Sequence, residues 1–209
     1  MTVVIGLTGG IASGKSVVSA MLAEHGAHIL DADKVGHEAY ARGTACYNDV
    51  IAAFGDDIVA PDGEIDRKKL GTKVFADPAQ RRKLEGIVWP WMRGTMRQRL
   101  DGLRSQNVPV VVLEAAVLIE AGWQPLVDRV WLVTVNRDIA RERIISRNGL
   151  DGAQADARID AQLTNEERAQ HADLVIENNG SLDELRERVD DAWRTLQAAS
   201  ARAPAGRDA

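Results

Sequence analysis

A glycine-rich stretch near the start of the chain has the residue types and the spacing of a phosphate-binding loop. Residues 9–16 read Gly-Gly-Ile-Ala-Ser-Gly-Lys-Ser and fit the pattern G-x-x-x-x-G-K-[ST]. Glycines let the backbone curl so that successive N–H groups face one anion, and the dipole of a following helix attracts the same anion. Lys15 is expected to reach the β- and γ-phosphates, and the Ser16 hydroxyl to bind Mg²⁺. The stretch therefore predicts binding of a nucleoside triphosphate, in preference to an ordinary glycine-rich turn.

Two acidic residues follow short apolar runs and could take part in phosphoryl transfer. Asp33 comes shortly after the run 27–30, at the carboxyl end of an expected strand, where parallel sheets bind their ligands. It is our candidate for the carboxylate that orients or deprotonates an acceptor hydroxyl, with a helix N-cap as the alternative. Glu114 follows the run 110–113, where enzymes with such a loop place a metal-linked acid. A contact to Mg²⁺, direct or through water, and a solvated strand end both stay open for Glu114.

A cluster of arginines precedes a strongly polar segment. Its members are Arg137, Arg141, Arg143 and Arg147. Arginines on a mobile lid could close over a triphosphate and neutralise the group in transfer, whereas a solvated helix paired with Glu142 is the simpler alternative. The polar segment 151–171, read as a single helix, favours the lid.

Trp89 and Trp91 flank Pro90 within a helical stretch. Core packing suits at least one of the two, and an aromatic wall for an extended apolar substrate is the alternative. The four histidines show no metal-ligand spacing, and we assign them no chemistry.

Five short apolar runs alternate with helical patterns, which predicts an α/β fold with a five-stranded, doubly wound parallel sheet. The expected strands are 3–7, 27–30, 110–113, 129–135 and 174–176. The expected helices are 14–25, 34–42, 45–54, 67–75, 77–104, 138–146, 151–171 and 182–196. Because the link between neighbouring strands is usually much shorter, the strand-free stretch before Pro109 predicts an inserted helical subdomain.

Composition narrows the class of protein. The chain has 209 residues and a formal net charge of −5, which argues against general nucleic-acid binding. No apolar run approaches the roughly 20 residues of a membrane-spanning helix, and we expect no secretory signal. Cys46 is the sole cysteine, so no internal disulfide can form and a reducing cytoplasm is expected.

Several of these motifs together resemble the dephospho-CoA kinase family. The resemblance rests on the loop Gly-Leu-Thr-Gly-Gly-Ile-Ala-Ser-Gly-Lys-Ser at 6–16 and on Asp-Ala-Asp at 31–33. Further matching stretches are 54–70, 113–120, 143–150, Gln162 and 172–181. The loop alone is common to many families, whereas its combination with Asp-Ala-Asp and the late Ala-Asp-x-x-Ile-x-Asn-x-Gly is far more selective.

The resemblance implies a P-loop three-layer fold and transfer of the ATP γ-phosphate to the ribose 3′-hydroxyl of dephospho-CoA, with Mg²⁺ as cofactor. It implies one domain over residues 1–200, with a core of 1–33, 108–136 and 172–198. The helical insertion for the CoA substrate would be 34–107, the lid 137–171, and the tail 199–209 is expected to be disordered. A monomer or weak homo-oligomer without nucleic-acid or membrane partners is expected.

The resemblance also implies roles for individual residues. Catalytic roles fall on Asp33 as base, Lys15 and Arg143. ATP would be bound by Gly10, Ile11, Ala12, Ser13, Gly14, Lys15, Ser16, Val17 and Arg147. Dephospho-CoA would be bound by Thr8, Asp33, Trp89 and Glu120, and the metal by Ser16, with Glu114 as a further possible ligand.

The chain departs from the family pattern at Ala12, at Val17, which replaces the common threonine, at Trp89 and in the stretch 113–120. Ala12 stands where the family usually has glycine, and its methyl group is unstrained only if φ is negative. Trp89 stands where bacterial members usually have histidine.

Two other functions fit parts of the sequence. One is a P-loop kinase for another small molecule, such as a nucleoside or a metabolite. The other is a regulatory GTPase, since Asp33-Lys34-Val35-Gly36 fits D-x-x-G. The guanine-reading N-K-x-D motif is missing after the fourth expected strand, where Asn136-Arg137-Asp138 lacks the spacer.

Overall fold

The computed structural model describes residues 2–75 and 77–202. The chain divides into two compact units. One unit holds Met1–Leu30 together with Asn107–Ala209, and the other holds Asp31–Gln106. Each unit is described by itself below.

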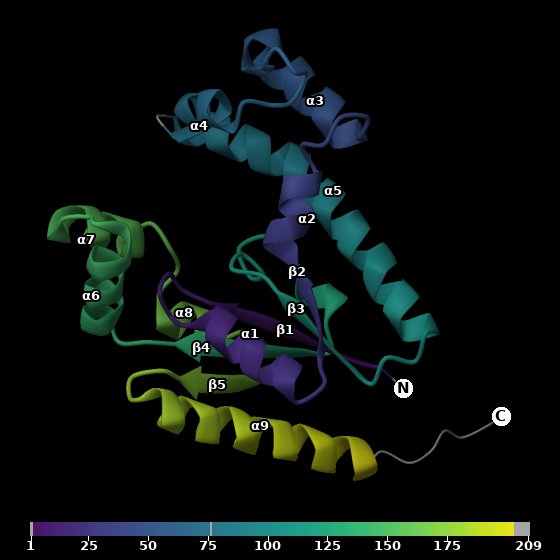
Figure 1. The fold of residues 1–209 in the computed structure, drawn as a ribbon, viewed down its shortest axis with the longest axis vertical. Helices are drawn as coiled ribbons and strands as arrows, with labels where there is room; N and C mark the ends of the chain where they lie inside the picture. The colour runs from purple at the N-terminus through teal and green to yellow at the C-terminus, as the bar shows by residue number, and fades with distance from the viewer. Residues whose placement is uncertain (1, 76, 203–209) are drawn as a thin grey trace. The chain divides into compact units, whose positions relative to one another are not determined.

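The first unit is built on a five-stranded sheet in the order β2-β3-β1-β4-β5 (Figure 1). The strands are β1 (Val3–Gly9), β2 (His28–Asp31), β3 (Val110–Glu114), β4 (Arg129–Thr134) and β5 (Leu174–Glu177). β1 pairs in parallel with β3 and β4, and β4 pairs in parallel with β5. β1 is buried along almost its whole length, as its continuous apolar run predicts for a central parallel strand. The phosphate loop therefore starts from the middle of the sheet.

Two helices cover one face of this sheet. They are α1 (Lys15–Glu24) and α9 (Leu182–Arg202), which lie side by side in Figure 1. Their apolar side chains form one core cluster with the strands, in which Leu22, Val133 and Val189 are fully buried. α1 ends before Gly26, whose φ of 95° suits a residue without a Cβ atom. Packing of α1 on the sheet fixes the direction in which its N-terminus points.

The polar segment after β4 contains three helices rather than the two expected. They are α6 (Arg137–Asn148), α7 (Gly152–Asp160) and α8 (Asn165–Ala169). The prediction of one helix over 151–171 is wrong, because Thr164 and Glu167 form a capping box that starts a new helix. The capping-box pattern was present in the sequence. The break places Gln162 and Leu163 in a connection instead of a helix.

Four helices form the second unit: α2 (Ala32–Glu38), α3 (Ala45–Phe54), α4 (Arg67–Phe75) and α5 (Pro78–Ser105). α5 packs against α2, α3 and α4, and Met96 and Leu100 lie in its buried face. Arg99 on α5 also forms an ion pair with Glu38 on α2. Pro90 lies inside α5 without ending it. A 3₁₀ helix, η1 (Asp56–Ile58), follows α3, and an isolated antiparallel bridge joins Val59 to Ile65.

The end of the chain differs from its prediction where the structure describes it. α9 continues to Arg202, so residues 199–202 are helical, although they were expected to belong to a disordered tail. The rest of that predicted tail, 203–209, lies outside the described residues. Among residues 2–75 and 77–202, no helix combines the length and the apolar character needed to cross a membrane.

Candidate nucleotide-binding and catalytic site

The phosphate loop leaves β1 and ends at the start of α1, with two residues in left-handed conformations. Gly14 has a φ of 91° and Ala12 a φ of 59°. A Cβ atom on Gly14 would lie 2.1 Å from Nδ2 of Asn178, so this position requires glycine for space as well as for φ. Ala12 has the strained conformation, and the condition of a negative φ is not met. The left-handed region costs an L-residue about 1–2 kcal/mol.

The N-terminus of α1 is open in a way that suits an anion. Gly14 is its N-cap residue, no side chain caps it, and its first turn contains no acidic residue. The helices of the second unit differ, since α2, α3 and α5 are capped by Asp31, Thr44 and Asp77. Helix starts normally use such side chains to satisfy their first N–H groups. A phosphate group could take that place at α1.

The loop lysine and serine both donate hydrogen bonds to one carboxylate oxygen. Lys15 Nζ lies 2.7 Å from Oε1 of Glu114, and Ser16 Oγ lies 2.9 Å from the same atom. The Lys15 and Glu114 side chains are only 12% and 11% exposed. Glu114 ends β3, the strand beside β1, which explains why it meets the loop. Of the two interpretations of Glu114, a solvated strand end is therefore wrong.

Opposing influences act on the pKa of Glu114. Burial raises it, and hydrogen bonds from Lys15, Ser19 and Ser16, with the charge of Lys15, lower it. The net direction is downward, so the carboxylate is held in its charged form. A charged Glu114 keeps Lys15 and Ser16 together before any ligand binds.

Oxygen donors suited to Mg²⁺ meet at this point. The Ser16 hydroxyl and the Glu114 carboxylate are adjacent, and Mg²⁺ usually takes one or two protein oxygens together with substrate phosphates and water. Within 2–75 and 77–202, no three His, Cys, Asp or Glu side chains gather to form a cage of protein ligands. The residues present thus fit a magnesium ion that is shared with phosphate groups.

Arg143 braces the second half of the loop from α6. Its Nη1 donates to the carbonyl oxygen of Ala12 at 3.2 Å, and its Nη2 to the carbonyl oxygen of Asn178 at 3.1 Å. Asn178 is buried and donates from Nδ2 to the carbonyl oxygen of Ser13 at 2.8 Å. The loop backbone is therefore held by two side chains that come from α6 and from the end of β5.

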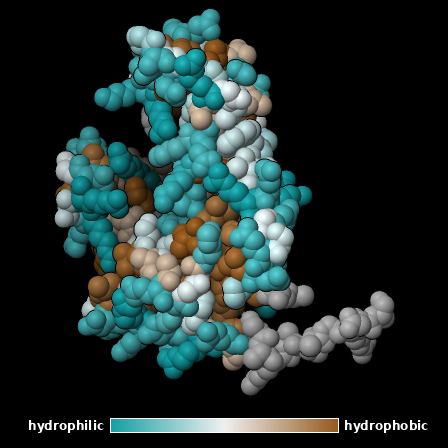
Figure 2. Space-filling model, turned by 45° about the vertical axis from the view of Figure 1, so that its right-hand side comes forward, coloured by the Kyte–Doolittle hydropathy of each residue, from teal (hydrophilic) through white to brown (hydrophobic). Residues whose placement is uncertain are grey.

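A pocket of about 450 Å³ opens beside this brace. Its lining includes Ile11, Val17, Arg147 and Leu182. Val17 and Leu182 are exposed apolar side chains, 42% and 59% exposed, and they offer a surface on which a flat ring can stack. The structure thus brings the expected ATP residues Val17 and Arg147 to one pocket. Figure 2 colours the residues by hydropathy, and hydrophobic residues (brown) lie among hydrophilic ones (teal) on the face that it shows.

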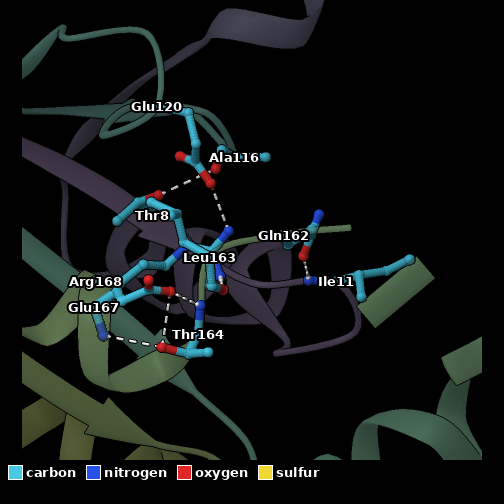
Figure 3. A network of polar contacts seen from close by, with 9 residues as sticks. All are labelled: Thr8, Ile11, Ala116, Glu120, Gln162, Leu163, Thr164, Glu167 and Arg168. Atoms are coloured by element: carbon cyan, nitrogen blue, oxygen red, sulfur yellow. Dashed lines mark hydrogen bonds and ion pairs between the residues drawn. The ribbon is translucent and has the colours of Figure 1, made fainter. Parts of the chain in front are cut away.

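The first half of the loop has other neighbours, shown in Figure 3. The Ile11 N–H donates to Oε1 of Gln162 at 2.8 Å. Thr8 is buried at the end of β1, and its hydroxyl lies 3.4 Å from the Ala116 carbonyl oxygen, to which it donates. Glu120 accepts a hydrogen bond from Arg168 at 2.6 Å. Thr8 and Glu120, both expected to bind the acceptor, thus lie in a network around the loop.

The two remaining candidates, Asp33 and Trp89, belong to the second unit. Asp31, and not Asp33, caps α2: its Oδ1 accepts from the Asp33 N–H at 2.9 Å and from the Lys34 N–H at 3.3 Å. Asp33 is exposed in the first turn of α2, so the alternative of a plain N-cap is wrong for Asp33. Trp89 is half-buried on α5.

Asn178 and Arg168 are the residues around the loop that sequence reasoning did not single out. Asn178 lies in the stretch Ile-Glu-Asn-Asn-Gly-Ser, which contributed to the family resemblance but was given no role of its own. Arg168 lies in the segment 151–171, which was interpreted as a single polar helix of the lid. A capping box just before Arg168 was the available signal that the chain turns there.

Known proteins resemble this chain over nearly its whole length. The family model described as Dephospho-CoA kinase matches residues 3–184. Two relatives named Dephospho-CoA kinase, from Symbiobacterium thermophilum and Geobacter sulfurreducens, are each 47% identical to it. The first match covers 91% of this chain and 80% of the relative, and the second covers 91% and 96%.

Solved structures agree with these matches. The crystal structure of TT1252 from Thermus thermophilus has a TM-score of 0.78 and 33% identity, covering 95% of this chain and 97% of that one. The dephospho-CoA kinase from Campylobacter jejuni has a TM-score of 0.74 at 24% identity, with coverage of 96% and 100%. A shikimate kinase from Bacteroides thetaiotaomicron shares the fold at a TM-score of 0.53 and 14% identity, with coverage of 93% and 98%.

Proposed function

The chain belongs to the dephospho-CoA kinase family, and from this we propose that it transfers the γ-phosphoryl group of ATP to the ribose 3′-hydroxyl of dephospho-CoA. The products would be coenzyme A and ADP, in the last step of coenzyme A synthesis. Membership of a kinase family decides against the regulatory GTPase that one short motif allowed. The same membership favours dephospho-CoA over other small-molecule acceptors.

The observation that carries this proposal is the convergence of Lys15, Ser16 and Glu114 at the uncapped start of α1. A lysine ammonium, a hydroxyl and open backbone N–H groups are the groups that neutralise and orient a triphosphate. The pocket lined by Val17 and Arg147 adjoins the same loop and has room for a nucleoside. The arrangement thus supports the donor half of a phosphoryl transfer.

The reaction assigns a task to each charged group. The acceptor oxygen forms a bond to the γ-phosphorus as the bond from that phosphorus to the β–γ bridging oxygen breaks. Asp33 accepts the proton that the 3′-hydroxyl loses, and ADP leaves with the bridging oxygen. We expect Lys15 to exchange the Glu114 carboxylate for β- and γ-phosphate oxygens, and Arg143 to stabilise charge in the transition state.

Magnesium fits this scheme through two residues. Ser16 would bind the ion, and Glu114 would bind it directly or through water. When bound, Mg²⁺ would neutralise phosphate charge and help to orient the triphosphate.

The acceptor side rests on the family resemblance. Thr8, Asp33, Trp89 and Glu120 are our candidates for contacts to dephospho-CoA. We keep the division into a helical insertion at 34–107 and a lid at 137–171 as a proposal. A cytoplasmic enzyme would suit a chain with one free, buried cysteine. We also propose that the chain is a monomer or a weak homo-oligomer.

The test is a transfer assay with the purified chain, Mg-ATP and a panel of acceptors. We expect coenzyme A and ADP to form in equal amounts from dephospho-CoA. Phosphate transfer to shikimate, nucleosides and pantetheine should have a kcat/KM at least about 100-fold lower. A site that hydrogen-bonds one acceptor leaves its polar groups unpaired when another acceptor binds, which can give discrimination of roughly 10⁴-fold.

A dephospho-CoA analogue without the 3′-hydroxyl provides the matched control. It should bind and compete with dephospho-CoA but accept no phosphate. Faster transfer to another acceptor, or no transfer to dephospho-CoA while ATP is bound, would show that the proposed function is wrong.

A further inference from the structure

Arg168 is a buried cation to which the proposed reaction gives no task. Its side chain is 2% exposed, although α8, on which it lies, is only five residues long. Its Nη2 donates to Oε1 of Glu120 at 2.6 Å, and its Nη1 donates to the carbonyl oxygen of Leu163. A charge removed from water is tolerated only when it is paired and hydrogen-bonded in this way. Arg168 thus joins α8 to the segment after β3 and to the α7–α8 connection.

The α7–α8 connection in turn touches the phosphate loop. Gln162 lies beside Leu163 in that connection, and its Oε1 accepts the Ile11 N–H at 2.8 Å. A Cβ atom on Gly10 would lie 3.3 Å from Nη1 of Arg168 and 3.5 Å from Oε1 of Gln162. The absence of a side chain at Gly10 therefore lets the loop approach both residues. Figure 3 shows these side chains together around the loop.

We propose that Arg168 is a positioning residue for ATP: by holding the Leu163 carbonyl and Glu120, it sets Gln162 against the Ile11 N–H and thereby fixes the first half of the phosphate loop. Arg168 itself acts only through Gln162. The inference rests on the proposed function insofar as the loop is taken to bind ATP. It gives the α7–α8 connection a task in shaping the loop before the nucleotide arrives.

The two halves of the loop then have separate supports. Arg143 and Asn178 hold the carbonyl groups of Ala12 and Ser13. Gln162, from the α7–α8 connection, holds the peptide N–H of Ile11. A loop whose N–H groups are fixed in advance loses less conformational entropy when it binds phosphate. Loss of the Gln162 contact should therefore weaken ATP binding without removing any chemical group from the reaction.

The buried pair offers a way to separate positioning from stability. Replacing a buried ion pair by apolar side chains of similar size is often neutral for stability, whereas removing one partner is costly. In the double variant Arg168→Met with Glu120→Leu, no charge is left unpaired, but the hydrogen bond to Leu163 is lost. A purely structural pair predicts normal ATP affinity for this variant. A positioning pair predicts weaker ATP binding at near-normal thermal stability.

The experiment measures the Kd for Mg-ATP, the KM for ATP and for dephospho-CoA, kcat and the melting temperature. The variants are Gln162→Ala, Arg168→Met, their combination, Arg168→Lys and the apolar double variant. Gln162→Ala should raise the Kd and KM for ATP roughly 3- to 10-fold, the effect of one lost hydrogen bond, with kcat nearly unchanged. Arg168→Met should raise the Kd and KM for ATP by a similar factor. The combined variant should show no clearly larger rise than either single variant. Arg168→Lys should recover part of the affinity.

Arg186→Met is the matched control. Arg186 also forms a 2.6 Å ion pair, with Glu24, but both side chains are exposed and belong to α9 and α1, away from the loop. Its Kd for ATP should equal that of the unaltered chain.

Three results would overturn the proposal: unchanged ATP affinity in Gln162→Ala, additive effects in the combined variant, or a change in melting temperature alone in the apolar double variant. Gln162 is exposed, so Gln162→Ala decides the question even if Arg168→Met fails to fold. A chain that binds ATP without phosphorylating dephospho-CoA would contradict the proposed function only, because ATP affinities still test Arg168. A chain that binds no ATP would overturn both.

Discussion

The phosphate loop and the helix that carries Asp33 satisfy their polar groups in different ways. At the loop, α1 starts without a side-chain cap, and the surrounding contacts come from distant segments: Glu114, Arg143, Gln162 and Asn178. At α2, the N-cap Asp31 bonds to backbone N–H groups two and three residues ahead. One region is held by tertiary contacts, and the other by its own neighbours in sequence.

This difference separates two ways of presenting chemistry. The loop is shaped before its ligand binds, because four side chains fix it and the start of α1 is left for an anion. The Asp33 side chain is exposed and does not cap α2, because Asp31 is the N-cap residue. We therefore expect changes at the loop to alter ATP binding, the free energy of unfolding or both, whereas a change at Asp33 should alter chemistry alone. Four substitutions test that contrast.

The largest effect is expected from Asp33→Asn. The amide cannot accept a proton, so kcat should fall roughly 10²- to 10⁴-fold, the usual contribution of a general base. The Kd for Mg-ATP and the melting temperature should stay within error of the unaltered chain. Steady-state kinetics with calorimetric ATP titration would measure both.

Asp31→Asn is the control for Asp33→Asn. Asparagine caps a helix about as well as aspartate, so α2 should be preserved, and we expect kcat within a few-fold of normal. Normal turnover in Asp33→Asn, or an equal loss in both variants, would contradict the role given to Asp33.

Gly14→Ala should have the next largest effect, on stability and ATP binding together. The new methyl group meets Nδ2 of Asn178 at 2.1 Å and needs a φ of 91°. Strain and a broken hydrogen bond from Asn178 to Ser13 should cost about 2–4 kcal/mol in the free energy of unfolding. Urea denaturation and ATP titration would show both losses.

Gly26→Ala separates strain from the clash. Gly26 has a similar φ of 95°, but a Cβ atom there meets nothing within 4 Å. It should cost only about 1–2 kcal/mol, the strain alone, and leave ATP affinity unchanged. Equal effects of the two variants would mean that Asn178 does not shape the loop.

The same contrast explains what the sequence could predict. The loop uses residues close in sequence, so its pattern was readable, whereas the N-cap considered for α2 was Asp33 and the structure has Asp31 there. Five parallel strands followed from the alternation of apolar runs with helical patterns. Asn178 bonds to Ser13, 165 positions away, and Arg168 pairs with Glu120, 48 positions away, and no local pattern specifies such contacts. The break at Gln162 was missed because a polar helix and two short capped helices have similar composition.

Glu114→Gln should have a smaller effect, with a defined pH dependence. The pKa of Glu114 is lowered on folding: burial opposes ionisation, but the hydrogen bonds from Lys15, Ser19 and Ser16 outweigh it. The folded chain then binds fewer protons than the unfolded chain, so the stabilisation is present above the ordinary value of 4.5 and is lost as pH falls through the lowered pKa. At neutral pH the variant should be about 1 kcal/mol less stable than the unaltered chain. This difference in the free energy of unfolding should disappear once the pH has fallen below the lowered pKa of Glu114.

Asp57→Asn in the second unit is the comparison for this experiment. The pKa of Asp57 is also lowered, chiefly by its hydrogen bond from Lys73, but the Asp57 side chain is exposed. Solvent screens such pairs, so the gap at neutral pH should be smaller than for Glu114→Gln. Urea denaturation of both variants beside the unaltered chain at several pH values measures the gaps. A pH-independent gap for Glu114→Gln would be evidence against a charged Glu114 in the folded chain.

The smallest effect is expected from Ala12→Gly, and its sign is what matters. Glycine relieves the left-handed strain at a φ of 59°, but it loses more backbone entropy on folding. The free energy of unfolding should therefore rise by only about 0.5 kcal/mol. Ala20→Gly, at an exposed position inside α1, should instead cost about 1 kcal/mol. Thermal unfolding would show the opposite signs. Because Arg143 and Asn178 hold the carbonyl groups of Ala12 and Ser13, ATP affinity in Ala12→Gly should change less than about twofold. A large loss of affinity would mean that the alanine methyl group, and not these side chains, keeps the loop in shape.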